Sequence, residues 1–325
     1  MRQSLRSEVV ACIACLLLGS TTACSAGPDL NPLEVHIINV GQGDAILIRC
    51  PDGTHELLID AGDNRYRGSA AAFKAYMGAE QATDNHIEVV IASHPHADHI
   101  GSMAWLLSHY TVDLYVDNGN VYDSRTYERV DDAFDFNTTS YWSAQDDVVP
   151  DIDFCPREDV SATILRPEGF GESSDPNNNS VIVRVDYLND SFLFVGDCEG
   201  EEEDLLMEDD DTRELLDCDF LKVGHHCSNT SSSPEFLDTV TPDISAVSCG
   251  AKGVSTNSGY KHPRRAQLDL LLGHAAARDG PNVSMQAFDT VERVRKTVNL
   301  NKAVYVTTAE GDLVFESDGN GITRR

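Results

Sequence analysis

The chain has 325 residues, of which 54 are acidic and 24 basic, so its formal net charge at pH 7 is -30. A surface with this balance repels polyanions at long range and offers no broad basic footprint for nucleic acid. The length suffices for one large domain or two small ones after an N-terminal leader.

Residues 1–24 have the features of an export signal. Arginines precede a short apolar stretch, and small residues follow it up to Cys24. The stretch is too short to span a bilayer stably, and no later part of the sequence is long and apolar enough for a transmembrane helix. The sequence therefore predicts an exported protein, either secreted or attached to the cell envelope.

Cys24 is the candidate site of that attachment. The stretch Thr21-Thr22-Ala23-Cys24 resembles the lipobox of bacterial lipoproteins, in which the cysteine is acylated, although Thr21 stands where leucine is usual. Ordinary cleavage nearby, for example after Ala26, is the alternative. A lipid on Cys24 would make the membrane a partner of the protein.

Six cysteines follow the signal. In an exported protein an even count favours disulfides over free thiols, and the sequence does not select the pairing. Because none of them forms a C-x-x-C pair, a structural zinc knuckle is not expected. The six are Cys50, Cys155, Cys198, Cys218, Cys227 and Cys249.

Short apolar or alternating runs bounded by Gly, Asp or Asn predict the strands. In the first half the expected strands are 33–40, 45–49, 56–59, 87–92 and 112–116, with helices at 69–77 and 99–108. Residues 117–156 are polar and aromatic, and we expect a lobe there with one helix near 122–134. In the second half the expected strands are 162–165, 181–187, 192–195, 220–223 and 244–248, with helices at 234–240 and 263–272 and a closing hairpin of 304–307 and 313–316.

Within each half, strands come first and helices follow. This order favours two sheets packed face to face with helices outside over a doubly wound parallel sheet. We expect one domain over residues 28–317 and a tail over 318–325. The acidic run 199–211 contains leucines that form an apolar stripe, so its carboxylates are expected on the solvated face of a helix. It lacks the ligand spacing and central glycine of a calcium loop.

The strongest chemical signal is the group His94, His96, Asp98 and His99, which follows an apolar strand and precedes a helix. In an extended segment His94 and His96 point to the same side and can bind one metal ion, while Asp98 and His99 reach a second. Imidazoles and carboxylates are the ligands of a hydrolytic metal. The sequence therefore predicts one or two divalent cations, zinc first and manganese as the alternative.

Further ligands are expected at the ends of other strands. Asp197 follows an apolar strand and is expected to bridge two cations, and His225 and His226 end a later strand in the same way. Which of the two histidines binds metal stays open, and we assign His226 to the metal and His225 to catalysis. Asp60 is expected to orient the loop or one of its histidines.

The order of these residues resembles the metallo-β-lactamase fold superfamily, and within it the hydrolase domain of the competence protein ComEC and its secreted relatives. Further blocks that carry the resemblance are VGQGDA at 40–45, PNNNS at 176–180, FLKVGHH at 220–226 and GYKHP at 259–263. It covers residues 35–317. It implies an α/β fold, an αββα four-layer sandwich with its metals at one edge.

The sequence departs from that family pattern at two places. Typical hydrolases of this fold carry a further histidine on the loop that corresponds to residues 174–180, which here has none, as in the ComEC-like group. One metal position is therefore short of a ligand. Cys227 stands where relatives usually have glycine, and it is expected to shape the pocket floor or to pair with Cys198.

The resulting hypothesis is a metal-dependent hydrolase of phosphoesters, mainly phosphodiesters, that uses an activated water molecule. Asp98 contributes to catalysis and metal binding, and His225 and His262 contact phosphate oxygens or protonate the leaving group. Asn178, Asn179 and Ser228 are the candidate substrate contacts.

The substrate and the class of function remain open. The resemblance implies DNA or RNA, whereas the acidic composition favours a nucleotide or an envelope phosphodiester. Hydrolysis of another ester or a lactam is a further alternative on the same fold. From a different class, the protein would be a lipid-anchored binding or assembly factor without catalysis.

Overall fold

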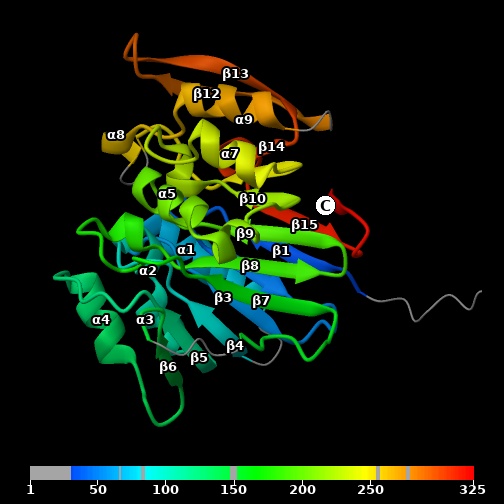
Figure 1. Ribbon diagram of the computed structural model, residues 1–325. Helices are drawn as coiled ribbons and strands as arrows, with labels where there is room; N and C mark the ends of the chain where they lie inside the picture. The colour runs from blue at the N-terminus through cyan, green and yellow to red at the C-terminus, as the bar shows by residue number, and fades with distance from the viewer. Residues whose placement is uncertain (1–30, 66, 82–84, 147–151, 254–256, 276–278) are drawn as a thin grey trace, which may run out of the picture. The chain divides into compact units, whose positions relative to one another are not determined.

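Two stacked β-sheets with helices on their outer faces form the framework of the protein (Figure 1). The computed structural model describes residues 31–65, 67–81, 85–146, 152–253, 257–275 and 279–325. The expected signal, with Cys24, lies outside the described residues. Within the described ranges, no helix has the length and apolar character needed to cross a membrane.

The first sheet changes from antiparallel to parallel pairing along its width. Pairs from β16 to β3 are antiparallel, and those from β3 to β6 are parallel, so strands β3 to β6 end at one edge. In spatial order its described strands are β16 (Ile322–Arg324), β15 (Leu313–Ser317), β1 (Leu33–Ile37), β2 (Ile46–Arg49), β3 (Glu56–Ile59), β4 (His86–Ile91), β5 (Thr111–Asp117) and β6 (Ser140–Ser143).

The second sheet has the same mixed character. Strands β14, β11, β10 and β9 are parallel neighbours, while β9, β8 and β7 pair antiparallel. In spatial order its described strands are β14 (Val304–Val306), β11 (Ile244–Val247), β10 (Phe220–Lys222), β9 (Asp190–Phe194), β8 (Ile182–Tyr187) and β7 (Val160–Leu165). A separate antiparallel pair, β12 (Asp279–Asp289) and β13 (Val294–Lys302), was not predicted.

The alternation of side chains along the strands explains the stacking of the sheets. In β8, Val183, Val185 and Tyr187 lie in the core between the sheets, while Arg184 and Asp186 on the opposite face form an ion pair. Two further cores lie on the outer faces of the sheets, under the helices. The structure is therefore the predicted αββα sandwich.

The outer cores are covered by different helices. On the first sheet, residues of α1 and α3 such as Phe73, Met103 and Leu106 pack against β3 and β4. On the second sheet the covering helices are α5, α7 and α9. The described helices are α1 (Arg67–Tyr76), η1 (Met77–Gln81), α2 (Ala97–Ile100), α3 (Met103–Leu107), α4 (Arg125–Ala133), η2 (Pro176–Asn179), α5 (Gly200–Glu208), α6 (Asp210–Arg213), η3 (Gly224–Cys227), α7 (Pro234–Val240), α8 (Asn257–Tyr260), α9 (Arg265–His274) and α10 (Thr307–Glu310).

The C-terminal part differs from the expectation. Strands β14 and β15 do not form a hairpin, because β14 pairs with β11 in the second sheet and β15 pairs with β1 in the first. Helix α10 carries the chain from one sheet to the other. Residues 318–325, expected to form a tail, include β16, which pairs with β15 at the edge of the first sheet.

The acidic run 199–211 forms α5 and α6, but its carboxylates are not all solvated. Glu202 and Glu203 are buried. Glu202 accepts a hydrogen bond from the backbone N–H of Ser180, and Glu203 accepts from those of Ser232 and Ser233. The prediction of a solvated helix face is therefore wrong for these two residues, because buried backbone donors need acceptors.

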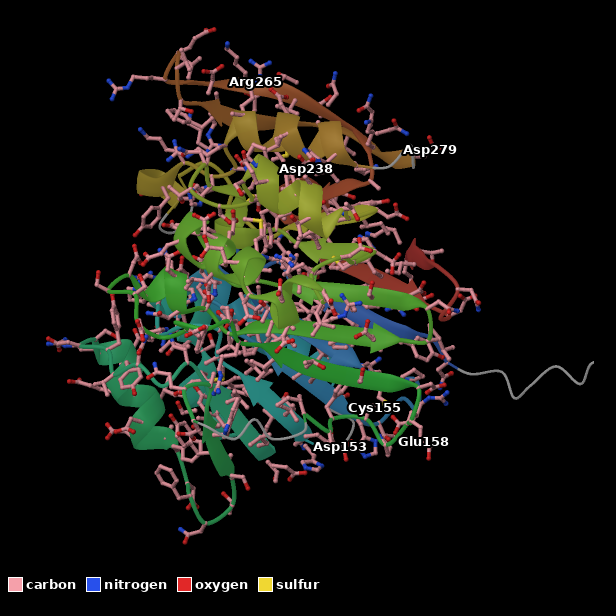
Figure 2. All side chains as sticks on the ribbon, in the orientation of Figure 1. Asp153, Cys155, Glu158, Asp238, Arg265 and Asp279 are labelled. Carbon is pink, nitrogen blue, oxygen red and sulfur yellow. A yellow bond between two sulfur atoms is a disulfide. The ribbon has the colours of Figure 1, made fainter. Side chains whose placement is uncertain are left out.

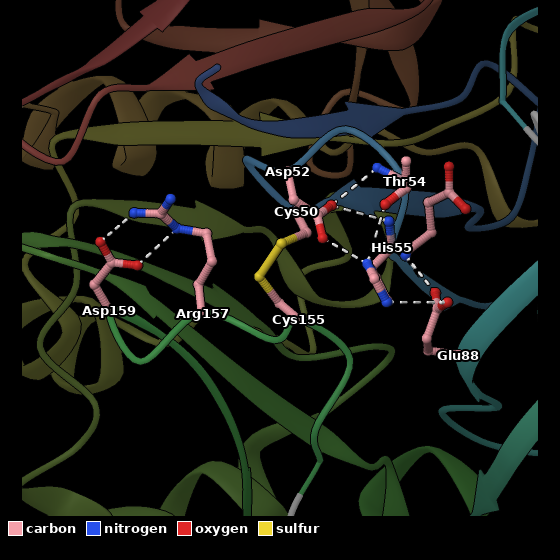
Figure 3. The surroundings of a disulfide bond; sticks show 9 residues. Cys50, Asp52, Thr54, His55, Glu88, Cys155, Arg157 and Asp159 are labelled. Atoms are coloured by element: carbon pink, nitrogen blue, oxygen red, sulfur yellow. Dashed lines mark hydrogen bonds and ion pairs between the residues drawn. A yellow bond between two sulfur atoms is a disulfide. The ribbon is translucent and has the colours of Figure 1, made fainter. Parts of the chain in front are cut away.

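One disulfide is present among the described residues, between Cys50 and Cys155 (Figure 3). It joins the end of β2 to the segment before β7 and so connects the two sheets. The other four cysteines after the signal are free and buried, against the expectation from their even number. Cys198 and Cys227 do not pair, because their Sγ atoms face the carbonyl oxygens of Glu199 and Arg264.

Removal of this disulfide in Cys50→Ala/Cys155→Ala should lower the free energy of unfolding by about 2–4 kcal/mol. The bond links positions separated by 105 residues, and such a long closed loop restricts the unfolded chain. Urea denaturation followed by circular dichroism measures the change. Reductant should destabilise the wild type equally and leave the variant unchanged, and a wild type insensitive to reductant would contradict the prediction.

Candidate metal centre

The carboxyl ends of four strands bring the predicted residues together. Because β3 and β4 are parallel, Asp60 after β3 and the segment 94–99 after β4 lie at one edge of the first sheet. Because β9 and β10 are parallel, Asp197 after β9 and the pair 225–226 after β10 lie at one edge of the second sheet. The two edges face each other, and side chains from both sheets meet between them.

A buried triangle of atoms forms the centre. The Nε2 atom of His99 lies 3.2 Å from Oδ1 of Asp197, Nε2 of His226 lies 3.3 Å from the same oxygen, and the two nitrogens are 3.3 Å apart. A carboxylate oxygen of Asp98 lies 3.8 Å from His226 Nε2. Oδ1 of Asp197 is buried and has no hydrogen-bond partner in the described chain. A buried carboxylate oxygen that has no hydrogen-bond donor and lies between two imidazole rings fits a cation site.

The structure distinguishes His226 from His225 within the pair. His226 is buried, and its atoms fall within groups of possible ligands together with Asp98 and His99, or with Asp44 and Asp197. His225 belongs to no such group among the described residues, and its Nε2 lies 3.7 Å from Asp197. The geometry therefore favours His226 as the ligand.

His94 and His96 lie side by side next to the buried triangle. His94 groups with His99 and Asp197, with its Nε2 atom 3.9 Å from Oδ2 of Asp197. His96 is not part of any ligand group in the described ranges, and its Nδ1 lies 3.0 Å from Nε2 of His94. Two imidazole nitrogens at this distance can bind one ion, so the expected pairing of His94 with His96 stays a prediction.

Asp60 holds His99 in position. Its Oδ2 lies 2.7 Å from Nδ1 of His99 and accepts a hydrogen bond from the hydroxyl of Ser93, while its Oδ1 accepts from the backbone N–H of Ser93. With Nδ1 of His99 bound to Asp60, Nε2 is directed at Asp197. This is the geometry of a carboxylate that orients a metal-binding histidine.

Asp44 and Lys222 support His226, and sequence reasoning missed both. Nδ1 of His226 donates to the carbonyl of Ser248, 3.0 Å away, and lies 3.4 Å from Oδ1 of Asp44. The buried amine of Lys222 donates to Oδ2 of Asp44 over 2.7 Å. The sequence feature that could have indicated this pair is the lysine inside the apolar strand 220–223, because a buried lysine needs a carboxylate partner.

Gly43 permits the close approach of the first turn to the metal loop. A Cβ atom at this position would lie 2.1 Å from the carbonyl oxygen of Asp98, and its φ of 128° disfavours other residues. The backbone N–H of Asp44 donates to that same oxygen over 3.2 Å. The stretch 41–43 is therefore the turn that places Asp44 beside the centre.

His225 lines a cavity of about 440 Å³, which Asp197 and His226 of the buried triangle also line. Its Nδ1 donates to Oε1 of Glu199, 2.6 Å away, and Glu199 also accepts from the hydroxyl of Thr230. His225, His226 and Cys227 all have positive φ, so the chain turns sharply enough to direct the two rings differently. Cys227 is buried and occupies a backbone position that favours glycine.

The pKa directions show a strongly negative centre. Burial by itself lowers the pKa of His99 and His226. The nearby Asp197 carboxylate has a larger opposite effect, so the pKa of His99 is well above its usual range and the pKa of His226 is about 10. Burial raises the pKa of Asp197, and the nearby histidines hold it well below its usual range. A divalent cation would replace the two protons that these histidines hold against the carboxylates.

His262 lines the same cavity and is held neutral. Burial, together with His226 and His225, lowers the pKa of His262 to about 2. The Nε2–H of Gln42 lies 3.2 Å from Nδ1 of His262 and donates to it, and Oε1 of Gln42 accepts from the backbone N–H of Gly250. The neutral ring therefore carries its proton on Nε2.

The amide and hydroxyl side chains that we expected to contact substrate do not line the cavity. Asn178 donates to Glu201, Asn179 exchanges hydrogen bonds with Ser173, and neither lines the cavity. Both amides stabilise the loop before β8. Of the three consecutive asparagines 177–179, Asn177 lines the cavity. Ser228 is buried and bonds to Thr230, so it also lies away from the cavity wall.

Comparison with known proteins finds relatives of this chain. The chain is 27% identical over 259 residues to ComE operon protein 3 of Bacillus subtilis, covering 74% of this chain and 31% of that protein. It is 27% identical over 254 residues to Recombination protein 2 of Haemophilus influenzae, covering 78% of this chain and 28% of that protein. The chain spans less than a third of these relatives. The matches confirm the predicted resemblance to competence proteins.

Two solved structures are similar to this chain at low sequence identity. The metallo-β-lactamase fold protein YhfI of Bacillus subtilis has a TM-score of 0.48 at 13% identity, covering 87% of this chain and 99% of that chain. The short form of human tRNase Z has a TM-score of 0.42 at 15% identity, covering 67% and 93%. Residues 38–251 match the family model described as Metallo-beta-lactamase superfamily. The chain therefore belongs to the metallo-β-lactamase superfamily.

Proposed function

We propose that this protein hydrolyses phosphodiesters with the help of divalent cations. The observation that carries the proposal is the buried oxygen of Asp197, without a hydrogen-bond partner in the described chain, between His99 and His226 at the base of a cavity. The cavity wall supplies donors suited to an anionic ester, including Gln42 and His262.

Asp98, His99, Asp197 and His226 would hold one cation, and His94 with His96 and a carboxylate oxygen of Asp197 marks a place for a second. A cation held there would lower the pKa of a water molecule and neutralise charge that develops on the phosphate. Zinc suits this set of imidazoles and carboxylates, and manganese is the alternative. The loop 174–180 contributes no histidine, so the second place has fewer ligands.

The remaining residues act on the substrate. His262 donates from Nε2 to a phosphate oxygen, because its Nδ1 already accepts from Gln42. His225 keeps Nε2 toward the cavity, because its Nδ1 is bonded to Glu199, and from Nε2 it protonates the leaving oxygen. Asn177 contacts a phosphate oxygen in place of Asn178 and Asn179, whose amides are committed to the loop.

Replacing a proposed ligand should abolish activity and metal binding together. In His99→Ala and Asp197→Ala we expect turnover of bis-p-nitrophenyl phosphate to fall more than about 100-fold, with a matching loss of bound metal measured by elemental analysis. The control is His109→Ala, an exposed histidine outside the cavity. Turnover that survives in both ligand variants would contradict the mechanism. A wild type that binds no metal would favour a binding or assembly protein.

The proton donor can be tested separately from the metal site. In Glu199→Gln we expect a loss of about 10- to 100-fold in kcat for a dinucleoside monophosphate, whose alkoxide leaving group needs a proton. For bis-p-nitrophenyl phosphate, whose leaving group is stable without a proton, the loss should stay below about threefold. Equal losses on the two substrates would show that Glu199 does not act through protonation. Thr230→Val, which removes the other hydrogen bond to Glu199, is the matched control.

A further inference from the structure

A second pocket, walled mainly by aromatic rings, lies beside the segment 94–99. It has a volume of about 220 Å³. Most of its wall comes from α4, β5, β6 and the loops between them, which lie at the opposite end of the ribbon from Arg265 on α9 (Figures 1 and 2). Five tyrosine and phenylalanine rings line it, those of Tyr115, Tyr127, Phe134, Phe136 and Tyr141.

The pocket is separate from the cavity of the metal centre. Within the described ranges, no residue that lines the pocket also lines the cavity. His94 and Pro95 belong to the wall of the pocket, whereas His96 and Asp98 belong to the wall of the cavity. An occupant of the pocket is therefore a ligand distinct from the phosphoester proposed for the cavity.

The rings form one connected cluster, and no cation of the described chain lies over them. The rings of Tyr115 and Tyr141 are nearly parallel, with their centroids 6.5 Å apart. The centroid of the Phe134 ring lies 5.5 Å from that of Tyr115 and 4.5 Å from that of Phe136. Phe136 is 73% exposed and Tyr141 is 45% exposed. Aromatic rings that are this accessible beside a pocket indicate a ligand-binding surface.

Two carboxylates, those of Asp117 and Asp131, line the pocket together with the rings. Oδ1 of Asp117 accepts hydrogen bonds from the hydroxyl of Tyr141 over 2.9 Å and from the backbone N–H of Gly119 over 2.8 Å. Neither carboxylate forms an ion pair in the part of the chain that the structure describes, and no lysine or arginine of that part lines the pocket. Burial raises the pKa of Asp117, so its negative charge lacks compensation.

Rings and unpaired carboxylates attract the same class of ligand. The face of an aromatic ring carries negative potential and attracts cations, and a carboxylate withdrawn from water needs a positive partner. A neutral ligand would leave Asp117 uncompensated, and the two carboxylates would repel an anion. A quaternary ammonium group suits such walls, because its methyl groups contact the rings and its charge needs no hydrogen-bond acceptors. A primary ammonium group would need acceptors for three N–H donors.

We propose that this pocket binds a small organic cation of the quaternary ammonium class. Its methyl groups lie against the rings of Tyr115, Phe134, Phe136 and Tyr141, and Asp117 balances its charge. The volume is below the roughly 300 Å³ of pockets that hold drug-sized ligands, so it suits a group of a few heavy atoms. The net charge of -30 attracts cations to the protein from a distance. The proposal goes beyond the phosphodiesterase function and does not depend on it.

Choline and its neutral isostere 3,3-dimethylbutan-1-ol test the role of the charge, because they share one shape and differ in the charged nitrogen. Isothermal titration calorimetry of the wild type should show saturable binding of choline at one site, and at least about tenfold weaker binding of the isostere. Vesicles provide a second arm of the test. Binding of phosphatidylcholine vesicles in preference to phosphatidylglycerol vesicles identifies a lipid headgroup as the source of the cation, and binding of choline alone identifies a free solute.

Variants separate the rings from simple apolar packing. Phe134→Leu/Phe136→Leu keeps apolar side chains without the rings and should weaken choline binding about 5- to 30-fold, whereas Phe134→Tyr/Phe136→Tyr should restore it. Asp117→Asn should weaken choline binding at least about tenfold. The matched control is Asp132→Asn, an exposed carboxylate of α4 that does not line the pocket and should bind choline as the wild type does. Circular dichroism checks that each variant is folded.

Three results would overturn the proposal. One is binding of the neutral isostere as tightly as choline, which would make the pocket merely apolar. Another is choline binding that neither Asp117→Asn nor the double leucine variant changes, which would place the cation elsewhere. The third is a folded wild type that binds neither choline nor phosphatidylcholine. None of these measurements involves turnover, so they are independent of whether the metal centre hydrolyses phosphodiesters.

Discussion

The buried carboxylate of Asp197 is the group on which the rest of the site depends. A charge removed from water is tolerated only when partners of opposite sign surround it, and His99 and His226 supply them. Each histidine has a partner on its other nitrogen, Asp60 for His99 and the Ser248 carbonyl for His226. The centre is thus a chain of alternating charge that runs through both sheets.

The continuation of that chain explains the buried lysine. Asp44 lies beside His226, and Lys222 compensates the second oxygen of Asp44. Because burial alone would raise the pKa of Asp44, Lys222 and His226 are what hold it low. Lys222 lies on the second sheet and Asp44 between the first two strands of the first sheet. The same interaction that supports the metal centre therefore joins the two sheets.

Site residues could be predicted from the sequence where the pattern that marks them lies within a few neighbouring positions, and not where it depends on contacts between distant segments. His94, Asp98, His99 and Asp197 could be proposed as ligands because they are polar residues at the ends of apolar strands, a pattern visible over a few positions. The pairing of Lys222 with Asp44 spans 178 positions, and only the fold reveals it. The amides of Asn178 and Asn179 bond to Glu201 and Ser173 and do not line the cavity, and these partners are not evident from the motif.

In the fold, too, local features were predicted and long-range pairings were not. Short segments with clear boundary residues were predicted closely, and 56–59 and 234–240 match β3 and α7. The hairpin expected at 304–316 failed because two adjacent strands were assumed to pair, whereas each completes a different sheet.

The most direct test of the account is the position of the metal. Anomalous diffraction from crystals grown with zinc should show an ion within about 2.0–2.2 Å of His99 Nε2, His226 Nε2 and a carboxylate oxygen of Asp197 or Asp98. An ion bound elsewhere, with no anomalous density between these side chains, would contradict the claim that the buried Asp197 carboxylate is built for a cation.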